Sequence, residues 1–220
     1  VAIQAGTYIA NTVQPEPRAR HAWAADVGTE IRFWKDQYAW RPVVGAEYIF
    51  YSGNNSEVED TLSGEDYTGW NRMFRGKVDS AIHEWYNVFY TTGMPTTERA
   101  DTNLHQLILT GSLQPMDNLK LDGRFIKFRL HENAWSGENL ATALGHGVQE
   151  KDAGNELDLE LTYEYTEDVT FGLLTAWFWS GDYYWTPEDT PQSATNVAGA
   201  DSGKPKTVAN EVVATCKVSF

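Results

Sequence analysis

The chain has 220 residues, which is enough to bury an ample core in one large domain or in two smaller ones. Its 31 acidic and 17 Lys or Arg side chains give a formal charge of -14, which argues against a nucleic-acid surface or a polybasic membrane patch as its main role. The mean hydropathy is -0.48 and no long continuous apolar run occurs, so the sequence predicts no transmembrane helix. Its single cysteine, Cys216, excludes an internal disulfide and a zinc cluster built from Cys. The sequence begins without Met or an apolar leader, so we expect a processed chain or a piece of a longer one.

Alternation of apolar and polar side chains predicts eight strands. In chain order they cover about residues 1–11, 21–33, 38–52, 103–114, 119–131, 155–166, 169–182 and 207–220. Short turns rich in Asp, Asn or Pro are expected at 34–37, 115–118 and 166–169, and longer polar loops at 12–20, 53–102, 132–154 and 183–206. Short and long connections alternate, as they do in bacterial outer-membrane barrels. We therefore predict an all-β fold, an antiparallel transmembrane β-barrel in one domain over residues 1–220, with a soluble β-sandwich or lipocalin-like binder as the alternative.

The polar face of the predicted strands needs contact with water. In 155–166 a row of carboxylates shares one face, and such a row is too costly for a dry core. On a barrel this face lines the lumen. The predicted pore-lining residues are Arg32, Arg41, Glu47, Lys120, Asp122, Arg124, Lys127, Arg129, Glu156, Asp158, Glu160 and Glu164. These residues have two possible roles. They form cross-strand ion pairs within a wall that faces water, or they create a transverse electric field across a pore constriction.

Strand 119–131 departs from simple alternation. Lys120 and Arg124 share one parity. Lys127 and Arg129 have the other, so the alternation changes between residues 125 and 126. We expect a β-bulge at this point, or a strand that leaves the membrane above it.

Aromatic side chains gather toward the two ends of the predicted strands, with mostly aliphatic residues between them. This is the arrangement of aromatic girdles at the two headgroup levels of a bilayer, although aromatic residues also favour strands in general. The predicted girdle residues are Trp23, Trp40, Tyr48, Tyr163, Tyr165, Trp177, Trp179 and Phe220.

Several segments, in the same order, resemble the alginate-export family of outer-membrane porins. They are "HAWAADVGTEIRFWKDQYAWRPVVGAEYIFYSGNNS" from His21, "GWNRMF" from Gly69 and "NELDLELTYEYTEDVTFGLLTAWFWSGDYY" from Asn155. The resemblance implies a Gram-negative outer membrane, and it implies that these strands are the C-terminal portion of a larger barrel. It also implies that Phe220 is the aromatic end that the barrel-assembly machinery recognises.

The predicted function is an outer-membrane channel for passive transport of polar or charged solutes or for export of a polysaccharide. The alternative is a non-conducting barrel that acts as an anchor or binding partner in the cell envelope. The predicted inward acids and bases are about equal in number, which suits a polyanion such as alginate poorly. None of the five His residues lies in a nucleophile or metal motif, so we expect no enzyme activity, catalytic residue, cofactor or metal centre.

The long loop at 53–102 carries two further features. Its acidic stretch, "NNSEVEDTLSGED", offers carboxylates for calcium at the outer surface, but the spacing matches no calcium loop and favours a solvated acidic face. Its later part, residues 72–90, has helical stretches with apolar side chains. These stretches fold back over the pore or pack on the barrel mouth, and packing on the mouth is the simpler expectation.

Overall fold

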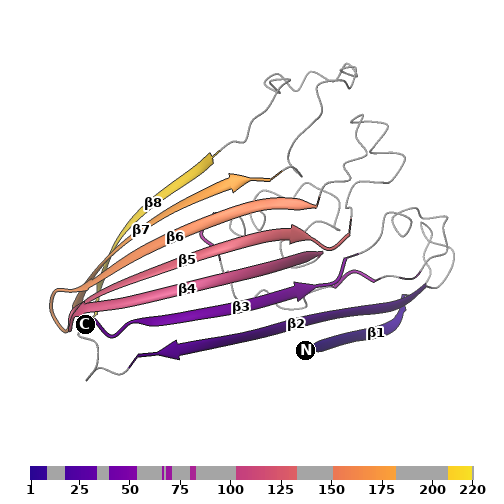
Figure 1. Cartoon of the computed structure of the whole chain (residues 1–220), viewed down its shortest axis with the longest axis horizontal. Helices are drawn as coiled ribbons and strands as arrows, with labels where there is room; N and C mark the ends of the chain where they lie inside the picture. The colour runs from indigo at the N-terminus through magenta and orange to yellow at the C-terminus, as the bar shows by residue number, and fades with distance from the viewer. Residues whose placement is uncertain are drawn as a thin grey trace, which may run out of the picture.

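The fold is a single meander of antiparallel strands (Figure 1). The computed structural model describes residues 1–8, 18–33, 40–53, 66, 68–70, 80–82, 103–132, 151–181 and 208–219. Its strands are β1 (Ala2–Tyr8), β2 (Arg18–Arg32), β3 (Val43–Tyr51), β4 (Leu104–Met116), β5 (Leu119–Leu130), β6 (Asp152–Glu164), β7 (Val169–Ser180) and β8 (Val208–Val218). Within these described ranges no helix is present that could cross a membrane.

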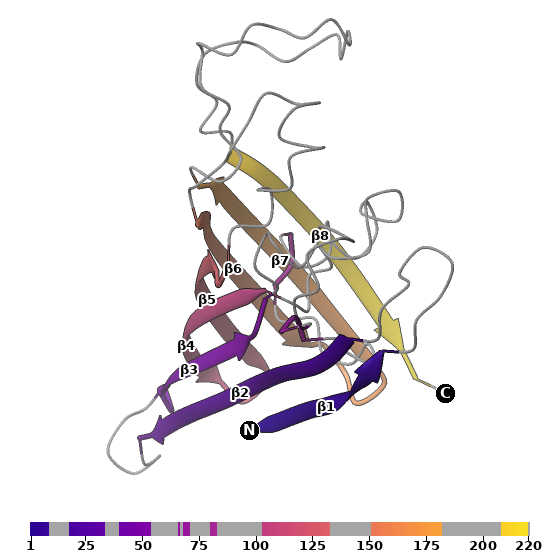
Figure 2. The same cartoon turned by 90° about the vertical axis from the view of Figure 1, so that its right-hand side faces the viewer.

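Each strand pairs with the next one along the chain, in the order β1 to β8. β1 pairs only with β2 and β8 only with β7, so the described sheet is open at both edges. The sheet is strongly curved, and the described parts of the 53–102 loop lie within its curve (Figure 2). The prediction of an all-β, antiparallel fold is confirmed, in the form of a partial barrel wall.

Three strands extend beyond the bounds that the sequence predicts, because backbone pairing continues there. β4 runs through Pro115 to Met116, so the expected four-residue turn is reduced to Asp117 and Asn118. The β4–β5 register shifts between Leu113 and Met116, an irregularity that accommodates a proline without an N–H for the ladder. β6 begins at Asp152, and β2 begins at Arg18, both earlier than the alternation indicates.

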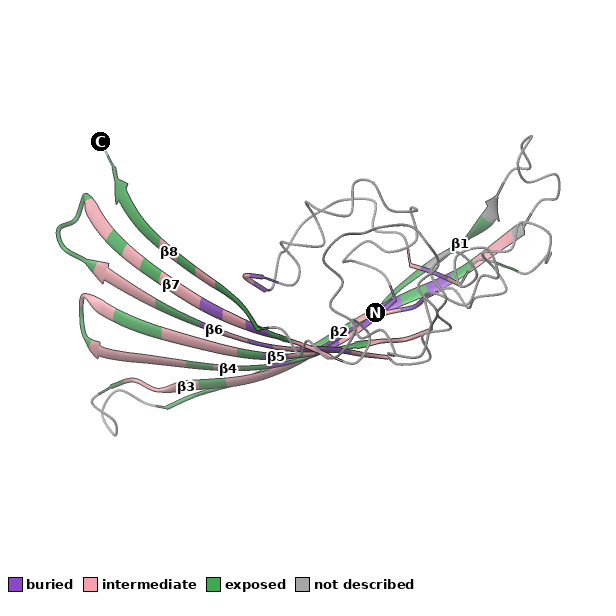
Figure 3. Cartoon of the chain, turned by 90° about the horizontal axis from the view of Figure 1, so that it is seen from above, coloured by how far each residue is buried: buried purple, intermediate pink, exposed green. Residues whose placement is uncertain are grey.

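The buried residues lie mostly toward the ends of the strands that carry the long loops (Figure 3). The buried apolar cluster contains Ile49, Ile82, Leu104, Ile108, Ile126, Phe128, Ala153, Ala176 and Phe178. All of these except Ile82 come from β3 to β7. A segment of the long loop therefore completes the apolar cluster of the wall.

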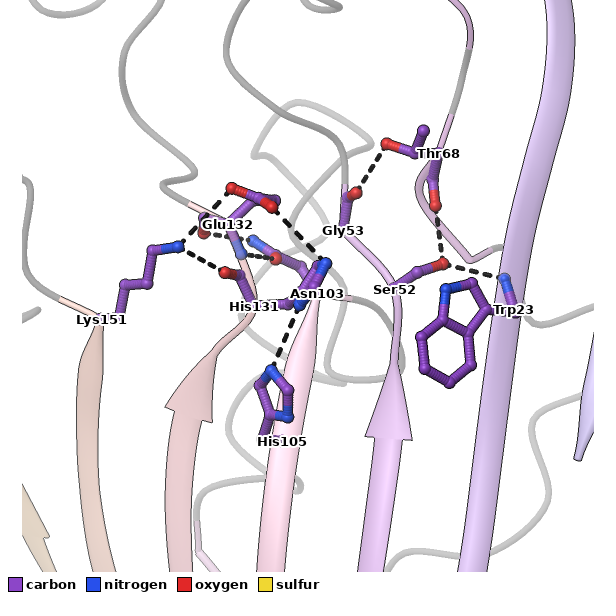
Figure 4. Close-up of polar contacts among 9 residues, drawn as sticks. All are labelled: Trp23, Ser52, Gly53, Thr68, Asn103, His105, His131, Glu132 and Lys151. Carbon is purple, nitrogen blue, oxygen red and sulfur yellow. Dashed lines mark hydrogen bonds and ion pairs between the residues drawn. The ribbon is translucent and has the colours of Figure 1, made fainter.

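A network of polar contacts fixes the two ends of the 53–102 loop side by side (Figure 4). The Ser52 hydroxyl accepts the Trp23 N–H at 3.0 Å and donates to the Thr68 carbonyl at 2.6 Å. Asn103, at φ 54°, donates through its side chain to the Glu132 carbonyl and accepts the Glu132 N–H at 2.7 Å. The loop thus leaves and re-enters the sheet at neighbouring strands β3 and β4.

Candidate pore wall

The charged side chains of β5 and β6 meet on the concave face. Arg124 lies directly opposite Asp158, an arrangement of opposite charges across the two strands. Asp122 lies opposite Glu160, and Lys120 forms an ion pair with Asp122 at 2.9 Å. Of the basic and acidic ladders predicted to face one another on these strands, only Arg124 and Asp158 are paired directly across the ladder on this face.

The other predicted lining residues are distributed along the wall and its turn end. The strand register puts Arg32, Glu47 and Glu164 on the same concave face. Arg41 lies at the turn end instead, where its guanidinium donates to Gln114 at 3.1 Å and to Asp117 at 2.6 Å. Arg41 therefore holds the connection between β2 and β3 against the β4–β5 turn.

Lys127 and Arg129, which the sequence predicts to line the pore, lie instead on the convex face, away from Arg124. The bulge expected at residues 125–126 is absent, because β5 pairs with β4 without a register shift from Leu121 to Leu130. The irregularity in the β5–β6 ladder falls later, between Phe128 and Arg129. β5 keeps its alternation, so the other expectation for this point, a strand that leaves the membrane above it, stays a prediction.

A short loop segment reaches the concave face at two buried carboxylates. Glu156 accepts the N–H of Ile82 at 2.7 Å, and Asp158 accepts the N–H of Ala81 at 3.3 Å. Glu156 is fully buried and Asp158 is 7% exposed. Glu156 is four residues inside the loop end of β6, roughly 13 Å along the strand. Of the two placements expected for the 72–90 stretches, these described residues favour the folded-back one, while the rest of that range lies outside the described residues.

The two carboxyl groups lie two residues apart on β6 and therefore share the concave face. Asp158 Oδ1 is buried and has no hydrogen-bond partner among the described residues. The pair therefore combines two backbone donors with one acceptor that has no partner among the described residues.

The predicted girdle residues on the strands lie on the convex face. Pairing from β3 to β7 places Tyr48 and Trp179 in one row near the loop ends. Near the turns the rings of Tyr163, Tyr165 and Phe171 lie within 6.5 Å of one another in successive pairs. Trp23 and Trp177 lie on the same convex face, the former 4.1 Å from the ring of Phe50, and Trp40 is exposed at the turn end. Phe220 lies outside the described residues.

A histidine pair at the loop end of the convex face was not singled out by the sequence. His105 Nδ1 lies 2.6 Å from the Tyr48 hydroxyl, and His105 Nε2 lies 3.2 Å from His131 Nδ1. Burial lowers the pKa of His131 and the nearby Lys151 ammonium lowers it further, against the opposing effect of Glu132. The alternation of β4 indicates which face His105 occupies. The position of His131, which follows the end of β5, is not indicated by any alternation.

The described residues offer no three-residue group of His, Cys, Asp or Glu that could hold a metal ion. Most of the acidic stretch at 54–66 lies outside them, except for Asp66. Asp66 accepts the N–H of Ala19 at 3.0 Å and lies 3.7 Å from His21 Nε2. Its carboxylate is therefore used within the wall.

The family comparison agrees with this architecture. The model of the family described as alginate export matches residues 1–199. The chain belongs to the alginate export family. This membership assigns it to an export and transport family and agrees with the curved antiparallel wall described above. A comparison with curated proteins finds no match.

Proposed function

We propose that this alginate export family chain forms part of the wall of an outer-membrane channel that exports a polysaccharide or passes polar solutes. The observation that carries the proposal is the opposite chemistry of the two faces of one sheet. The convex face exposes apolar side chains such as Val27 at 65%, Leu107 at 48% and Val212 at 69%. The concave face carries the charged rows of β5 and β6. An apolar face of this extent suits the acyl chains of a bilayer, and a charged face suits a water-filled lumen.

The first test is membrane insertion followed by conductance. The protein is expected to require detergent for extraction from bacterial outer membranes and to migrate differently on a gel before and after heating. After reconstitution it is expected to conduct ions across a planar bilayer. A protein that remains dispersed in plain buffer, or that inserts without any conductance, contradicts the channel.

The charges of the described concave face bear on the substrate. Its acidic residues are Asp26, Glu30, Glu47, Asp122, Glu156, Asp158, Glu160, Glu164 and Glu211. Its basic residues along the strands include Arg20, Arg32, Lys120, Arg124 and Lys217, which are fewer than the acids. This wall attracts cations, so we propose a polar or weakly charged polymer, or small polar solutes, in preference to a dense polyanion. Block of the current by a neutral dextran but not by alginate of similar length supports this substrate class, and the reverse order of block contradicts it.

A second candidate function is a non-conducting barrel that anchors or binds another envelope component. The observation that favours it is the 80–82 segment, whose Ile82 completes the apolar cluster on the concave face. A lumen filled in this way conducts little. This candidate predicts a correctly inserted protein with no measurable current and a partner that stays bound through purification.

We propose further that β8 is the strand through which the barrel-assembly machinery recognises the chain. Alternation continues through Val218, with Val212 and Ala214 on the convex face beside Thr175 and Leu173 of β7. Deletion of Phe220 tests this proposal. A lower yield of heat-modifiable protein in the outer membrane supports it, and an unchanged yield contradicts it.

A further inference from the structure

Two basic side chains of β5 lie on the face that the proposed function assigns to lipid. The β4–β5 ladder places Lys127 opposite Leu107 and Arg129 opposite His105. These are the last two convex positions of β5 before the loop. The convex position before them is occupied by Phe125, which is 39% exposed. The convex face of β5 therefore changes from apolar to basic at this level.

Arg129 has no carboxylate partner among the described residues. It is exposed, and within the described residues it forms no hydrogen bond or ion pair. Its neighbour across the β5–β6 ladder is Asp152. Asp152 Oδ1 already accepts from Lys127 Nζ at 2.6 Å and from the Gly154 N–H at 3.0 Å. This oxygen of the Asp152 carboxylate is thus engaged by other donors.

The described residues of this neighbourhood carry more positive than negative charge. Lys151 Nζ lies 3.6 Å from Glu132 Oε2 and donates to the His131 carbonyl at 2.6 Å. Among the described residues here, three bases, Lys127, Arg129 and Lys151, stand against two carboxylates, Asp152 and Glu132. Both ring nitrogens of His105 are engaged, by Tyr48 and His131, so His105 offers no acceptor to Arg129.

The level of these bases on the wall indicates what supplies the missing anion. Lys127 shares its row with the aromatic residues Tyr48 and Trp179. Aromatic rings and long basic side chains meet the headgroup layer of a bilayer, where the stem stays in apolar surroundings and the charged group reaches phosphates. A guanidinium forms paired hydrogen bonds to two phosphate oxygens, which an ammonium cannot do.

We propose that Arg129 and Lys127 form a binding site on the convex face for the phosphate of a lipid headgroup, in the leaflet on the side of the long loops. The proposal rests on the proposed membrane function. Arg129 holds the phosphate, and Lys127, already paired with Asp152, adds charge beside it. The site binds a lipid in preference to free phosphate, because the apolar surface at Phe125 and Leu107 lies next to it and accepts the acyl chains.

Native mass spectrometry of the intact protein in detergent tests the site. The probes are a short-chain phosphatidic acid, the diacylglycerol with the same chains, and inorganic phosphate. The wild type is expected to retain phosphatidic acid and not diacylglycerol. R129Q is expected to bind phosphatidic acid roughly tenfold more weakly, because it loses a charge-assisted hydrogen bond. K120Q, a change on the concave face of the same strand, is the matched control and is expected to bind like the wild type.

Three results overturn the site. They are equal binding by R129Q and wild type, an equal loss in K120Q, and displacement of phosphatidic acid by low millimolar inorganic phosphate. Heat-modifiable migration of each variant shows whether the barrel is folded. If R129Q does not fold, R129K is measured in its place and is expected to bind phosphatidic acid more weakly than the wild type, because an ammonium cannot form the paired hydrogen bonds of a guanidinium. Conductance separates this inference from the proposed function. If the wild type conducts normally and R129Q binds lipid as the wild type does, only the lipid site is contradicted. If the wild type fails to insert into bilayers, the proposed channel function is contradicted.

Discussion

Gly154 has a conformation and surroundings that only glycine fits. Its φ is +125°, and a Cβ at this position would lie 2.3 Å from the Trp179 carbonyl oxygen. It belongs to the irregularity that lets Asp152 pair with Arg129 after Gly154 has paired with Phe128. A side chain here strains the backbone and forces β6 away from β7.

Gly154→Ala is therefore expected to lower the free energy of unfolding by about 1–3 kcal/mol or more. The measurement is urea unfolding of the reconstituted protein, followed by tryptophan fluorescence. Gly111→Ala is the matched control, since a Cβ on Gly111 meets no atom within 4 Å, and it is expected to unfold like the wild type. Equal destabilisation by the two variants would show that loss of glycine flexibility, and not the contact at Trp179, sets the effect.

His131 makes stability depend on pH at the loop end of β5. Its pKa is lowered in the folded protein, chiefly by burial, so the folded state binds this proton less readily than the unfolded state. Its contribution is complete above the unfolded pKa of about 6.5 and is lost as the pH falls below that value. The midpoint of thermal unfolding is expected to drop between pH 7.5 and pH 5 in the wild type, and to drop less in His131→Asn. An identical drop in both proteins would assign the effect to other groups.

At the scale of elements, the 80–82 segment is held on the wall by hydrogen bonds from its backbone. Ile82 N–H donates to a carboxyl group that is completely buried, so removing that acceptor leaves a buried donor unsatisfied. Glu156→Ala is expected to raise the population of the detached segment roughly tenfold or more. The conductance of the reconstituted channel is expected to rise, and hydrogen exchange at residues 81 and 82 is expected to quicken.

Glu160→Ala serves as the control for this change. Glu160 lies on the same face of the same strand but is exposed. The Glu160→Ala substitution removes the same kind of side chain from this face, but Glu160 accepts no hydrogen bond from residues 80–82. If both variants raise the conductance equally, lumen charge explains the result and the segment does not close the pore.

The sequence predicted the strands well because strand alternation is local. A charged row such as Glu156, Asp158 and Glu160 needs water on one side, and that requirement assigned the concave face of β6 before any partner strand was known. The contact of Ile82 with Glu156 was not predictable in this way, because the two residues are 74 positions apart. Neither residue carries a local pattern that specifies the other.

The face that Lys127 occupies was also not predictable from the sequence. The break in the alternation of charges predicts a bulge near residue 125 if all four bases of β5 face water. The ladder is regular there, so Lys127 and Arg129 lie on the face opposite to Lys120 and Arg124. The charge of a side chain alone therefore does not determine which face of the sheet it occupies.

At the scale of the whole molecule, the two faces set the selectivity of the proposed channel. With Lys127 and Arg129 on the convex face, acids predominate on the described concave wall. Mobile cations concentrate beside such a surface, and the effect weakens as salt shortens the range of the field. A planar-bilayer measurement in a tenfold KCl gradient is expected to give a reversal potential whose sign shows a preference for cations.

This cation preference is expected to become smaller in molar salt and in the double variant Glu160→Gln, Glu164→Gln. Lys127→Gln should leave it unchanged, because Lys127 does not face the lumen in the described sheet. Anion preference in the wild type, or a change of selectivity in Lys127→Gln equal to that of the double variant, would mean that the concave face does not line the conducting path.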